Sequence, residues 1–192
     1  MGRYGDAAEL TRRAVFLDRD GTLNRAVERD GRPFPPASLA ELEMLPGVEQ
    51  ALEDLRGAGF MNIVITNQPD VVTGKLPLEA VEAIHAWMLE HLAIDEIRAC
   101  YETEDQATGR YKPAPGMLLE AARAHGIDLA RSHMIGDRWR DVGAGKAAGC
   151  FTYYLRNDYE ERKPEGPDET VGSLVEAARI ILTSIAREEI NS

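Results

Sequence analysis

Residues 14–24 read AVFLDRDGTLN, and this stretch decides the expected fold. Its first four residues are apolar, as in a strand that is buried on both faces of a parallel sheet. Asp18 and Asp20 follow this run, and Gly21 comes next, where the backbone has to turn. Residues at the carboxyl end of such a strand face the crevice in which open α/β sheets bind ligands. The stretch therefore predicts a strand that ends in a site, with a solvated strand-to-loop turn as the simpler alternative.

The bulk composition limits the kinds of partner. The chain has 192 residues, enough for one well-buried domain, and a formal net charge of −11. Because nucleic acids and anionic membranes attract basic surfaces, we expect neither as a partner.

Targeting signals are not expected either. Residues 1–13 lack a signal-peptide pattern, Asp6 stands where myristoylation needs Ser or Thr, and no stretch approaches about eighteen apolar residues. The two cysteines show no paired spacing, which fits a reducing compartment. We therefore expect a cytoplasmic protein, and we expect it to be a monomer.

Apolar runs alternate with segments of helical period along the chain. Besides the opening strand, we expect strands at 61–65, 94–101, 133–135 and 150–155. We expect helices at 46–57, 77–92, 117–124 and 141–148, and a last amphipathic helix at about 173–188. We expect loops at 25–46, 69–76, 102–111 and 157–167.

This alternation predicts an α/β fold, with one Rossmann-like parallel sheet sandwiched by helices. We expect a single domain over residues 1–192, with a core at about 14–155 and the terminal helix packed on it. The intervals from Asp18 to Thr66 and from Thr66 to Lys112 are each taken up by a helix and a strand. We therefore expect no separate cap domain, so that selection of water and substrate falls to the loops.

Polar residues follow the strands in chain order. They are Asp18, Asp20, Thr66, Asn67, Lys112, Asp137 and Asp141. The carboxyl ends of parallel strands meet at one edge of a sheet, so we expect these residues to form one site. Each has a simpler explanation: Thr66 could only end a strand, Lys112 could be solvated, and the last two aspartates could be turn and helix-cap residues.

Together these residues suit phosphoryl transfer. Asp18 could attack phosphorus and form an aspartyl-phosphate. Asp20 could protonate the leaving oxygen and then deprotonate the water that hydrolyses the intermediate. The hydroxyl of Thr66 and the charge of Lys112 could stabilise the phosphoryl oxygens.

A metal site is expected beside the nucleophile. Asp137, with Asp18 and the backbone carbonyl of Asp20, would provide an oxygen shell, and Asp141 would support it. All-oxygen ligation suits Mg²⁺. The metal would also remove the repulsion that otherwise favours protonation of Asp18.

Four segments resemble the motifs of the haloacid dehalogenase-like (HAD) phosphatase superfamily. They are Asp18-x-Asp20-Gly21-Thr22, Thr66, Lys112 and Gly136-Asp137-x-x-x-Asp141. Residues 17–24 with 66–68 resemble, more narrowly, the subgroup that contains D-glycero-D-manno-heptose 1,7-bisphosphate phosphatase and histidinol-phosphate phosphatase. The resemblance implies a Mg²⁺-dependent phosphoric monoester hydrolase with the roles given above. It also implies that Arg138, after the metal aspartate, contributes its backbone or side chain to the metal corner.

The chain departs from that subgroup in its loops. Relatives often carry a zinc-binding loop, but Cys100 alone occupies one of the four ligand positions. We therefore expect no structural zinc, so that the loop 102–111 needs another source of order or is mobile. Tyr111 stands where relatives commonly have a substrate-recognising arginine, Pro69-Asp70 replaces Ser-Gly, and Thr73 replaces a further arginine. These changes concern the substrate more than the reaction.

Basic residues gather in the loops of this acidic chain. They are Arg25, Arg29, Arg32, Lys75, Arg110, Lys112, Arg138 and Arg140. Together they favour a polyanionic small substrate such as a sugar bisphosphate, with ordinary surface charge as the alternative. We take as candidate substrate-binding residues Arg25, Asn67, Gln68, Arg110 and Tyr111. The four histidines, His85, His91, His125 and His133, show no ligand spacing and are expected to be structural or exposed.

The leading hypothesis is a phosphatase that acts on a phosphorylated sugar, with D-glycero-D-manno-heptose 1,7-bisphosphate, cleaved at its 7-phosphate, as the first candidate. Histidinol phosphate or another small alcohol phosphate is the alternative within the same chemistry. A different class is a phospho-accepting receiver or a non-catalytic interaction module. Receivers lack an acid/base two residues after the acceptor, so Asp20 distinguishes the two classes.

Overall fold

The computed structural model describes residues 12–29 and 31–190. Six of its strands form a parallel sheet in the order β5-β4-β1-β6-β7-β8. The strands are β1 (Arg13–Leu17), β4 (Phe60–Asn67), β5 (Glu96–Cys100), β6 (His133–Gly136), β7 (Phe151–Leu155) and β8 (Glu169–Val171). The chain runs outward from β1 through β4 to β5, and then from β6 outward through β7 to β8. The direction of winding therefore changes between β1 and β6, where open α/β sheets bind ligands.

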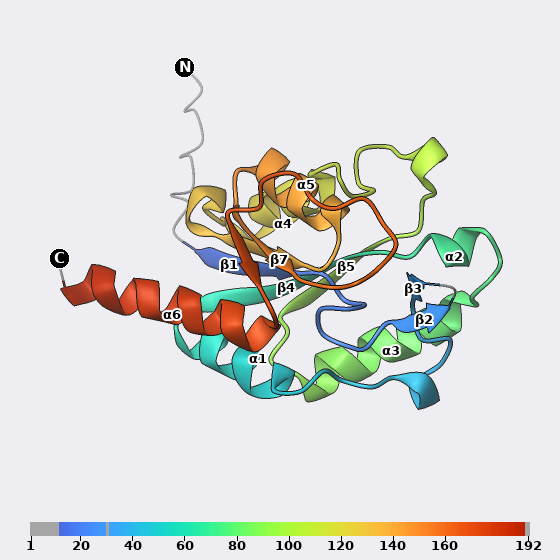
Figure 1. Ribbon diagram of the computed structural model, residues 1–192, viewed down its shortest axis with the longest axis horizontal. Helices are drawn as coiled ribbons and strands as arrows, with labels where there is room; N and C mark the ends of the chain where they lie inside the picture. Colours follow the sequence, from blue (N-terminus) through green and yellow to red (C-terminus); the bar gives the residue numbers. More distant parts are fainter. Residues whose placement is uncertain (1–11, 30, 191–192) are drawn as a thin grey trace, which may run out of the picture.

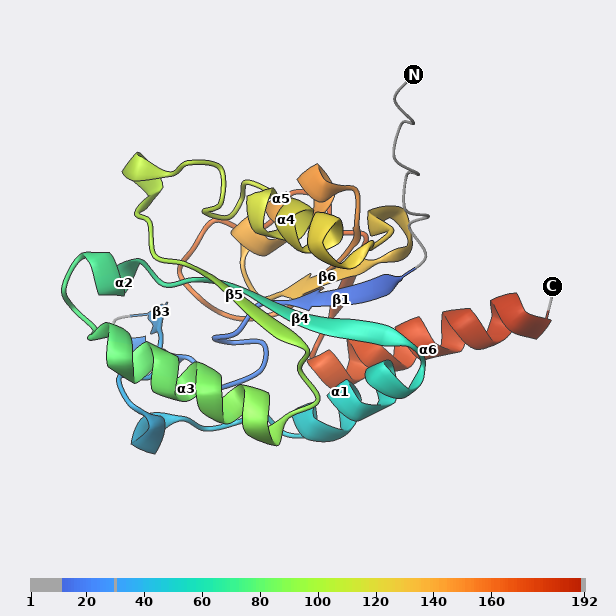
Figure 2. The ribbon, with the colours of Figure 1, turned by 180° about the vertical axis from the view of Figure 1, so that it is seen from behind.

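Helices cover both faces of this sheet (Figures 1 and 2). The helices on one face are α1 (Val48–Gly57), α3 (Leu78–His91) and α6 (Leu174–Ile190). Those on the other face are α4 (Gly116–His125) and α5 (Trp139–Ala148). The parallel α/β sandwich expected from the sequence is confirmed.

The side chains of β1 alternate between two hydrophobic cores. Val15 and Leu17 pack with α1, α3 and α6, whereas Ala14 and Phe16 pack with α4. All four side chains are fully buried. Because both faces of the strand are covered, the sequence shows a continuous apolar run instead of the alternation of a half-exposed strand.

Three expected loops contain further structure. The segment 25–46 holds an antiparallel hairpin of β2 (Val27–Arg29) and β3 (Arg32–Phe34) and the 3-10 turn η1 (Leu39–Glu41). The short helix α2 (Pro69–Val72) lies in 69–76, and the 3-10 turn η2 (Glu104–Gln106) lies in 102–111. A third turn, η3 (Leu129–Arg131), precedes β6.

The sequence prediction missed one strand of the sheet and misplaced one helix start. Strand β8 is short and depends on a distant contact, because the carboxylate of Asp168 accepts from the backbone N–H and the hydroxyl of Thr152 at 2.8 and 2.6 Å. Helix α5 begins at Trp139, two residues before the expected start at Asp141. The other expected strands and helices are confirmed, with small shifts of their ends.

Some expectations fall outside the described part. These are the ones on the segment 1–11 and on the side chains of Arg29 and Arg32. Among the described helices, none combines the length and the hydropathy that a membrane crossing requires.

We expect Leu52→Ala to lower the free energy of unfolding by about 2–5 kcal/mol, because it would leave a cavity between α1 and the sheet. Leu52 is fully buried, whereas Leu89 on α3 is 45% exposed. Leu89→Ala is therefore the matched control and should change stability by less than about 0.5 kcal/mol. Urea unfolding would measure both, and equal losses would contradict the placement of α1.

Candidate active site

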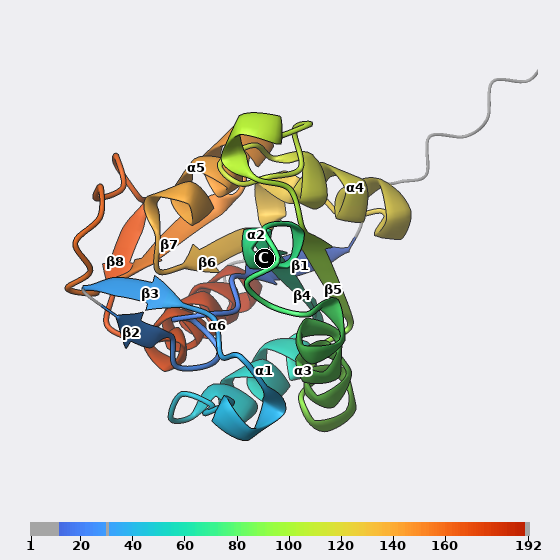
Figure 3. The same cartoon turned by 90° about the vertical axis from the view of Figure 1, so that its right-hand side faces the viewer.

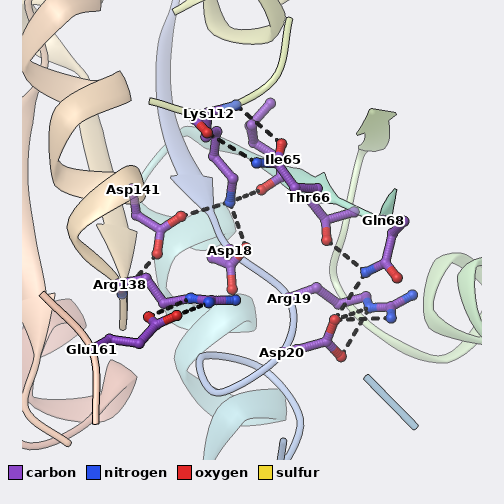
Figure 4. A network of polar contacts seen from close by, with 11 residues as sticks. Asp18, Arg19, Asp20, Ile65, Thr66, Gln68, Lys112, Arg138, Asp141 and Glu161 are labelled. Carbon is purple, nitrogen blue, oxygen red and sulfur yellow. Dashed lines mark hydrogen bonds and ion pairs between the residues drawn. The ribbon is translucent and has the colours of Figure 1, made fainter. Parts of the chain in front are cut away.

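Strand register brings the expected site residues to one edge of the sheet. Leu17 pairs with Val64 in β4 and with Ile135 in β6. The three strands therefore end side by side, and Asp18 and Asp137 leave them at the same edge. Figure 4 shows the polar network that results, with Lys112 reaching into it from the segment before α4.

Lys112 is the centre of this network. Its side chain is buried, and its Nζ donates to Asp18 Oδ1 at 2.5 Å, to Asp141 Oδ1 at 2.6 Å and to the carbonyl oxygen of Ile65 at 2.7 Å. Burial alone would lower the pKa of Lys112, but the two carboxylates outweigh it and raise that pKa. The lysine is therefore a permanent cation beside Asp18, as phosphoryl-transfer chemistry requires.

Asn67 fixes the segment that carries Lys112. Its Oδ1 accepts from the backbone N–H of Lys112 at 3.1 Å, and its Nδ2 donates to the carbonyl of Lys112 at 3.1 Å. Both ends of the amide are thus used within the protein. Asn67 was expected to bind substrate, and in the structure it holds the lysine segment against the end of β4.

Three buried carboxylates lie close together. Asp18, Asp137 and Asp141 offer oxygen atoms within 4.8 Å of one another. Burial, followed by the charge of Asp18, raises the pKa of Asp137 well above its ordinary value. Burial also raises the pKa of Asp18 to about 6, against the opposing effect of Lys112.

This cluster fits a divalent cation. Both carboxylate oxygens of Asp137 are buried without a well-formed hydrogen bond among the described residues, although the hydroxyl of Tyr159 lies nearby. Buried polar atoms normally have partners, and hard carboxylate oxygens are the ligands of Mg²⁺. A cation held by Asp18 and Asp137 would supply the missing partner and remove the mutual repulsion.

Two glycines allow the backbone to approach these carboxylates. Gly21 has φ +92°, and a Cβ there would lie 1.9 Å from Oδ2 of Asp137. A Cβ on Gly136 would lie 2.3 Å from Cβ of Asp141. The sequence suggested only the turn at Gly21, because the close approach depends on the fold.

Asp141 serves both the site and the start of α5. Its Oδ2 accepts from the backbone N–H of Arg138 at 2.9 Å, in a capping arrangement, while its Oδ1 accepts from Lys112. Its expected supporting role is compatible with both contacts, because a carboxylate has two oxygens.

The side chain of Arg138 does not act as a metal ligand. It forms an ion pair with Glu161, in which Nε donates to Oε2 at 2.8 Å. A guanidinium has no acceptor to offer a cation. Of the two contributions expected from Arg138 at the metal corner, backbone or side chain, the structure favours the backbone, whose N–H donates to Asp141.

The side chain of Asp20 is held by neutral and cationic donors. Asn24 Nδ2 donates to its Oδ1 at 3.0 Å, and Gln68 Nε2 and Arg19 Nη2 each donate to its Oδ2 at 2.9 Å. Burial would raise the pKa of Asp20, but Arg19 and these hydrogen bonds lower it overall. Figure 4 shows this carboxylate directed toward Arg19 and Gln68, apart from the contacts of Lys112.

Arg19 is a site residue that the sequence prediction missed. It stands between the two aspartates, and it is fully buried. A buried arginine is rare unless paired, so an arginine directly after an apolar strand was the available signal. Gln68, expected to bind substrate, instead links Asp20 to Thr66, because its Nε2 also donates to Thr66 Oγ1 at 2.9 Å.

Two further candidates lie away from this network. Arg25 pairs with Glu43 at 3.0 Å, and its side chain is 59% exposed. Arg110 pairs with Glu120 of α4 at 3.1 Å. Neither arginine lines the cavities described next, whereas Tyr111 lines both.

Two adjoining cavities open at this edge of the sheet. The smaller, of about 70 Å³, is lined by polar groups, among them Asp18, Thr66, Lys112 and Arg140. The larger, of about 180 Å³, is lined by Phe34, Pro35, Asp70 and others. Both share a boundary that includes Asp20, Asn67, Tyr111 and Arg138. The smaller cavity suits a phosphoryl group, and the larger one suits the group to which it is attached.

The walls of the larger cavity come from loops. The hairpin β2–β3 supplies Phe34, and Figure 3 shows the hairpin beside the segment that follows β7. The backbone N–H of Glu160 in that segment donates to the carbonyl of Gly31 at 3.1 Å. The next residue, Glu161, holds Arg138, so one short segment connects the hairpin to the site.

The loop 102–111 is ordered by carboxylates. Glu102 accepts from the backbone N–H and the hydroxyl of Thr108 at 2.8 and 2.6 Å. Glu104 pairs with Arg140 of α5 at 2.5 Å. These contacts are the source of order that the loop 102–111 was expected to need in place of a zinc ion.

Comparison with known proteins gives consistent matches. Residues 37–149, more than half of the chain, match the family model described as haloacid dehalogenase-like hydrolase. The chain is 37% identical over 155 residues to D-glycero-beta-D-manno-heptose-1,7-bisphosphate 7-phosphatase of Rhodopseudomonas palustris. This match covers 74% of this chain and 83% of that protein. It is 33% identical over 185 residues to the protein of that name in Escherichia coli (strain K12), and this match covers 90% of each chain.

A solved structure extends this likeness. The crystal structure of D,D-heptose 1,7-bisphosphate phosphatase from B. bronchiseptica, complexed with magnesium and phosphate, superposes with a TM-score of 0.77 and 29% identity. That match covers 90% of this chain and 99% of the other. The HAD-like fold inferred from the sequence motifs is thereby confirmed.

We expect Asp137→Asn to stabilise the metal-free protein at neutral pH. In the folded protein the pKa of Asp18 is raised from 3.8 to about 6, and burial and the charge of Asp18 also raise the pKa of Asp137 well above its ordinary value. The folded state therefore binds these protons more tightly, and the stability of the metal-free protein falls as pH rises from about 4 through 6. Removing one of the repelling charges should raise the free energy of unfolding in EDTA by about 1–3 kcal/mol.

The same variant should lose the stabilisation that excess Mg²⁺ gives to the wild type, because it lacks a ligand. Thermal melting with EDTA and with Mg²⁺ would measure both effects, with Asp105→Asn on the exposed turn η2 as the control. A less stable Asp137→Asn protein in EDTA, or an undiminished effect of Mg²⁺ on it, would contradict the cation site.

Proposed function

The chain belongs to the haloacid dehalogenase-like hydrolase family, and we propose that it hydrolyses the 7-phosphate of D-glycero-D-manno-heptose 1,7-bisphosphate. The observation that carries the proposal is the buried contact of Lys112 with Asp18 at the rim of a cavity of phosphate size. The substrate rests on the relatives, which bear that activity in their names over most of this chain.

In the first step, a carboxylate oxygen of Asp18 attacks phosphorus. The bond from phosphorus to the leaving oxygen breaks, and its electron pair stays on that oxygen. The leaving oxygen takes a proton from Asp20, so that the sugar departs as an alcohol and Asp18 is left as an acyl phosphate. The position of Asp20 at the boundary of the two cavities supports this role.

In the second step, Asp20 accepts a proton from water while the water oxygen attacks phosphorus. The bond from phosphorus to Asp18 breaks, and inorganic phosphate leaves. The proton that Asp20 takes from water replaces the one that it gave to the leaving oxygen, so the two steps balance. The set of donors on its carboxylate favours the ionised form that accepts this proton.

Three groups stabilise the transferred phosphoryl group in this proposal. Lys112 provides a fixed positive charge, and Thr66 at the end of β4 provides a hydroxyl. Asp18 and Asp137 would hold Mg²⁺, which when bound neutralises charge on the phosphoryl oxygens. The buried oxygens of Asp137 support this assignment, since the described residues offer them no well-formed hydrogen bond beside the nearby hydroxyl of Tyr159.

The loops give support for a doubly charged substrate. Arg138 and Arg140 line the smaller cavity, and each is paired with a single carboxylate, Glu161 and Glu104 respectively. A second phosphate on the substrate could compete for either guanidinium. A phospho-accepting receiver is disfavoured, because Asp20 stands two residues after the nucleophile.

We expect Asp18→Asn to abolish turnover, with a loss of at least about 10³-fold in kcat, because the amide cannot act as the nucleophile. Melting should show a folded protein. Asp54→Asn, on the exposed face of α1, is the control and should keep wild-type activity. Phosphate release would be followed for each variant, and substantial release by Asp18→Asn would remove Asp18 from the nucleophile role.

Substrate preference should follow the proposed function. We expect kcat/KM for the heptose 1,7-bisphosphate to exceed that for histidinol phosphate by at least about tenfold, in line with recognition of a second anionic group. EDTA should suppress both reactions and Mg²⁺ should restore them. A higher kcat/KM for histidinol phosphate would reverse the assignment of substrate, and activity in EDTA would exclude the metal.

A further inference from the structure

A buried chain of contacts leads from helix α3 to the proposed acid/base. The guanidinium of Arg19 is fully buried and donates from Nε and Nη2 to the carboxylate of Asp20, at 2.9 to 3.2 Å. Its remaining terminal nitrogen, Nη1, lies 2.9 Å from Nε2 of His85. His85 therefore contacts the acid/base through one intermediate side chain.

His85 is neutral in this environment. Burial, followed by the charge of Arg19, lowers its pKa to about 4. Because Arg19 can only donate, Nε2 of His85 is the acceptor, and the ring carries its proton on Nδ1.

Helix α3 gives this histidine a rigid base. Ile84 and Met88 of the helix are buried in the hydrophobic core on one face of the sheet, and Val81 is buried as well. The planar guanidinium of Arg19 is buried and meets the carboxylate of Asp20 through Nε and Nη2. The second contact, to His85, fixes the plane of the guanidinium and with it the direction from which Asp20 is held.

The position of Asp20 makes the orientation of its carboxylate important. It lines both the smaller, phosphate-sized cavity and the larger cavity beside it. The oxygen that joins a phosphoryl group to the rest of a substrate would lie at that boundary. A displacement of about 1 Å in a catalytic group can cost a factor of 10² in rate.

We propose that His85 is a positioning residue for the phosphoryl-transfer step, and that it acts through Arg19 to hold Asp20 at the leaving oxygen. This inference rests on the proposed function, in which Asp20 gives its proton to that oxygen as the bond to phosphorus breaks. The electron pair of the bond stays on the oxygen, and the negative charge left on Asp20 faces the guanidinium of Arg19.

The expected effect of His85 on the rate depends on the leaving group of the substrate. An alkyl phosphate such as the sugar substrate releases a poor leaving group that needs the proton. p-Nitrophenyl phosphate releases a stable phenolate that does not. Because kcat/KM reports the steps up to the first irreversible one, it excludes the later hydrolysis of the acyl phosphate.

The experiment compares kcat/KM for the heptose bisphosphate and for p-nitrophenyl phosphate in variants of His85. His85→Leu removes the acceptor, and it should lower kcat/KM by about 10- to 100-fold for the sugar phosphate but less than about twofold for the aryl phosphate. His85→Gln restores an acceptor and should stay within about threefold of wild type on both. His91→Leu, an exposed position on the same helix, is the matched control and should change neither value.

Three results would overturn the inference: equal losses on both substrates, no loss on either, or a failure of His85→Gln to restore the sugar reaction. If His85→Leu does not fold, His85→Asn is the second variant, because its side chain is too short to reach Arg19 and it should show the same selective loss. Melting curves would establish folding for each variant.

Asp20→Asn distinguishes this inference from the proposed function. It should lose about 10²- to 10⁴-fold in kcat/KM on the sugar phosphate and much less on the aryl phosphate. If it shows no such selectivity, the role of Asp20 in the proposed function fails. If Asp20→Asn is selective and His85→Leu is not, only the positioning role of His85 is rejected.

Discussion

The structure of the site depends on one buried ammonium group among buried carboxylates. Lys112 Nζ contacts both Asp18 and Asp141, and Asp137 completes the cluster. When all are ionised, three carboxylates face one lysine, and two negative charges remain uncompensated in a region from which water is largely excluded. Leaving charges buried and unpaired is costly, and a divalent cation is the simplest group that balances them. The same charge imbalance is the reason why we expect the metal-free protein to be less stable and the site to prefer a doubly charged ion.

Strand register and two glycines bring these charged groups close together. Parallel register ends β1, β4 and β6 at one edge, and the missing side chains of Gly21 and Gly136 let the backbone pass within van der Waals distance of Asp137 and Asp141. The first turn of α5 then uses Asp141 both to begin the helix and to hold the lysine. The carboxylate of Asp141 thus serves both the start of the helix and the electrostatics of the site, and a substitution there would affect both.

The sequence predicted the sheet and the main chemical groups because both depend on local patterns. A continuous apolar run predicts a strand with two buried faces, and the polar residues after each strand must then meet. It did not predict the contact between Arg19 and His85, since that depends on which distant element covers a side chain. The same limit applies to β8, beside which Asp168 bonds with Thr152 of β7, and to Asn67, whose amide is used by a segment 45 residues away.

Carboxylates order the loops around the two cavities. Glu102 accepts a hydrogen bond from Thr108 across the loop 102–111. Glu104 forms an ion pair with Arg140, and Glu161 forms one with Arg138. Ion pairs at a cavity rim contribute little to stability, since solvent screens them. They do hold two arginines that line the smaller cavity, and in the proposed function a second phosphate would compete for either guanidinium. In the proposed function such a rim would meet a second phosphate with residues that also order the loop, because Glu104 contributes to the loop and to the ion pair with Arg140.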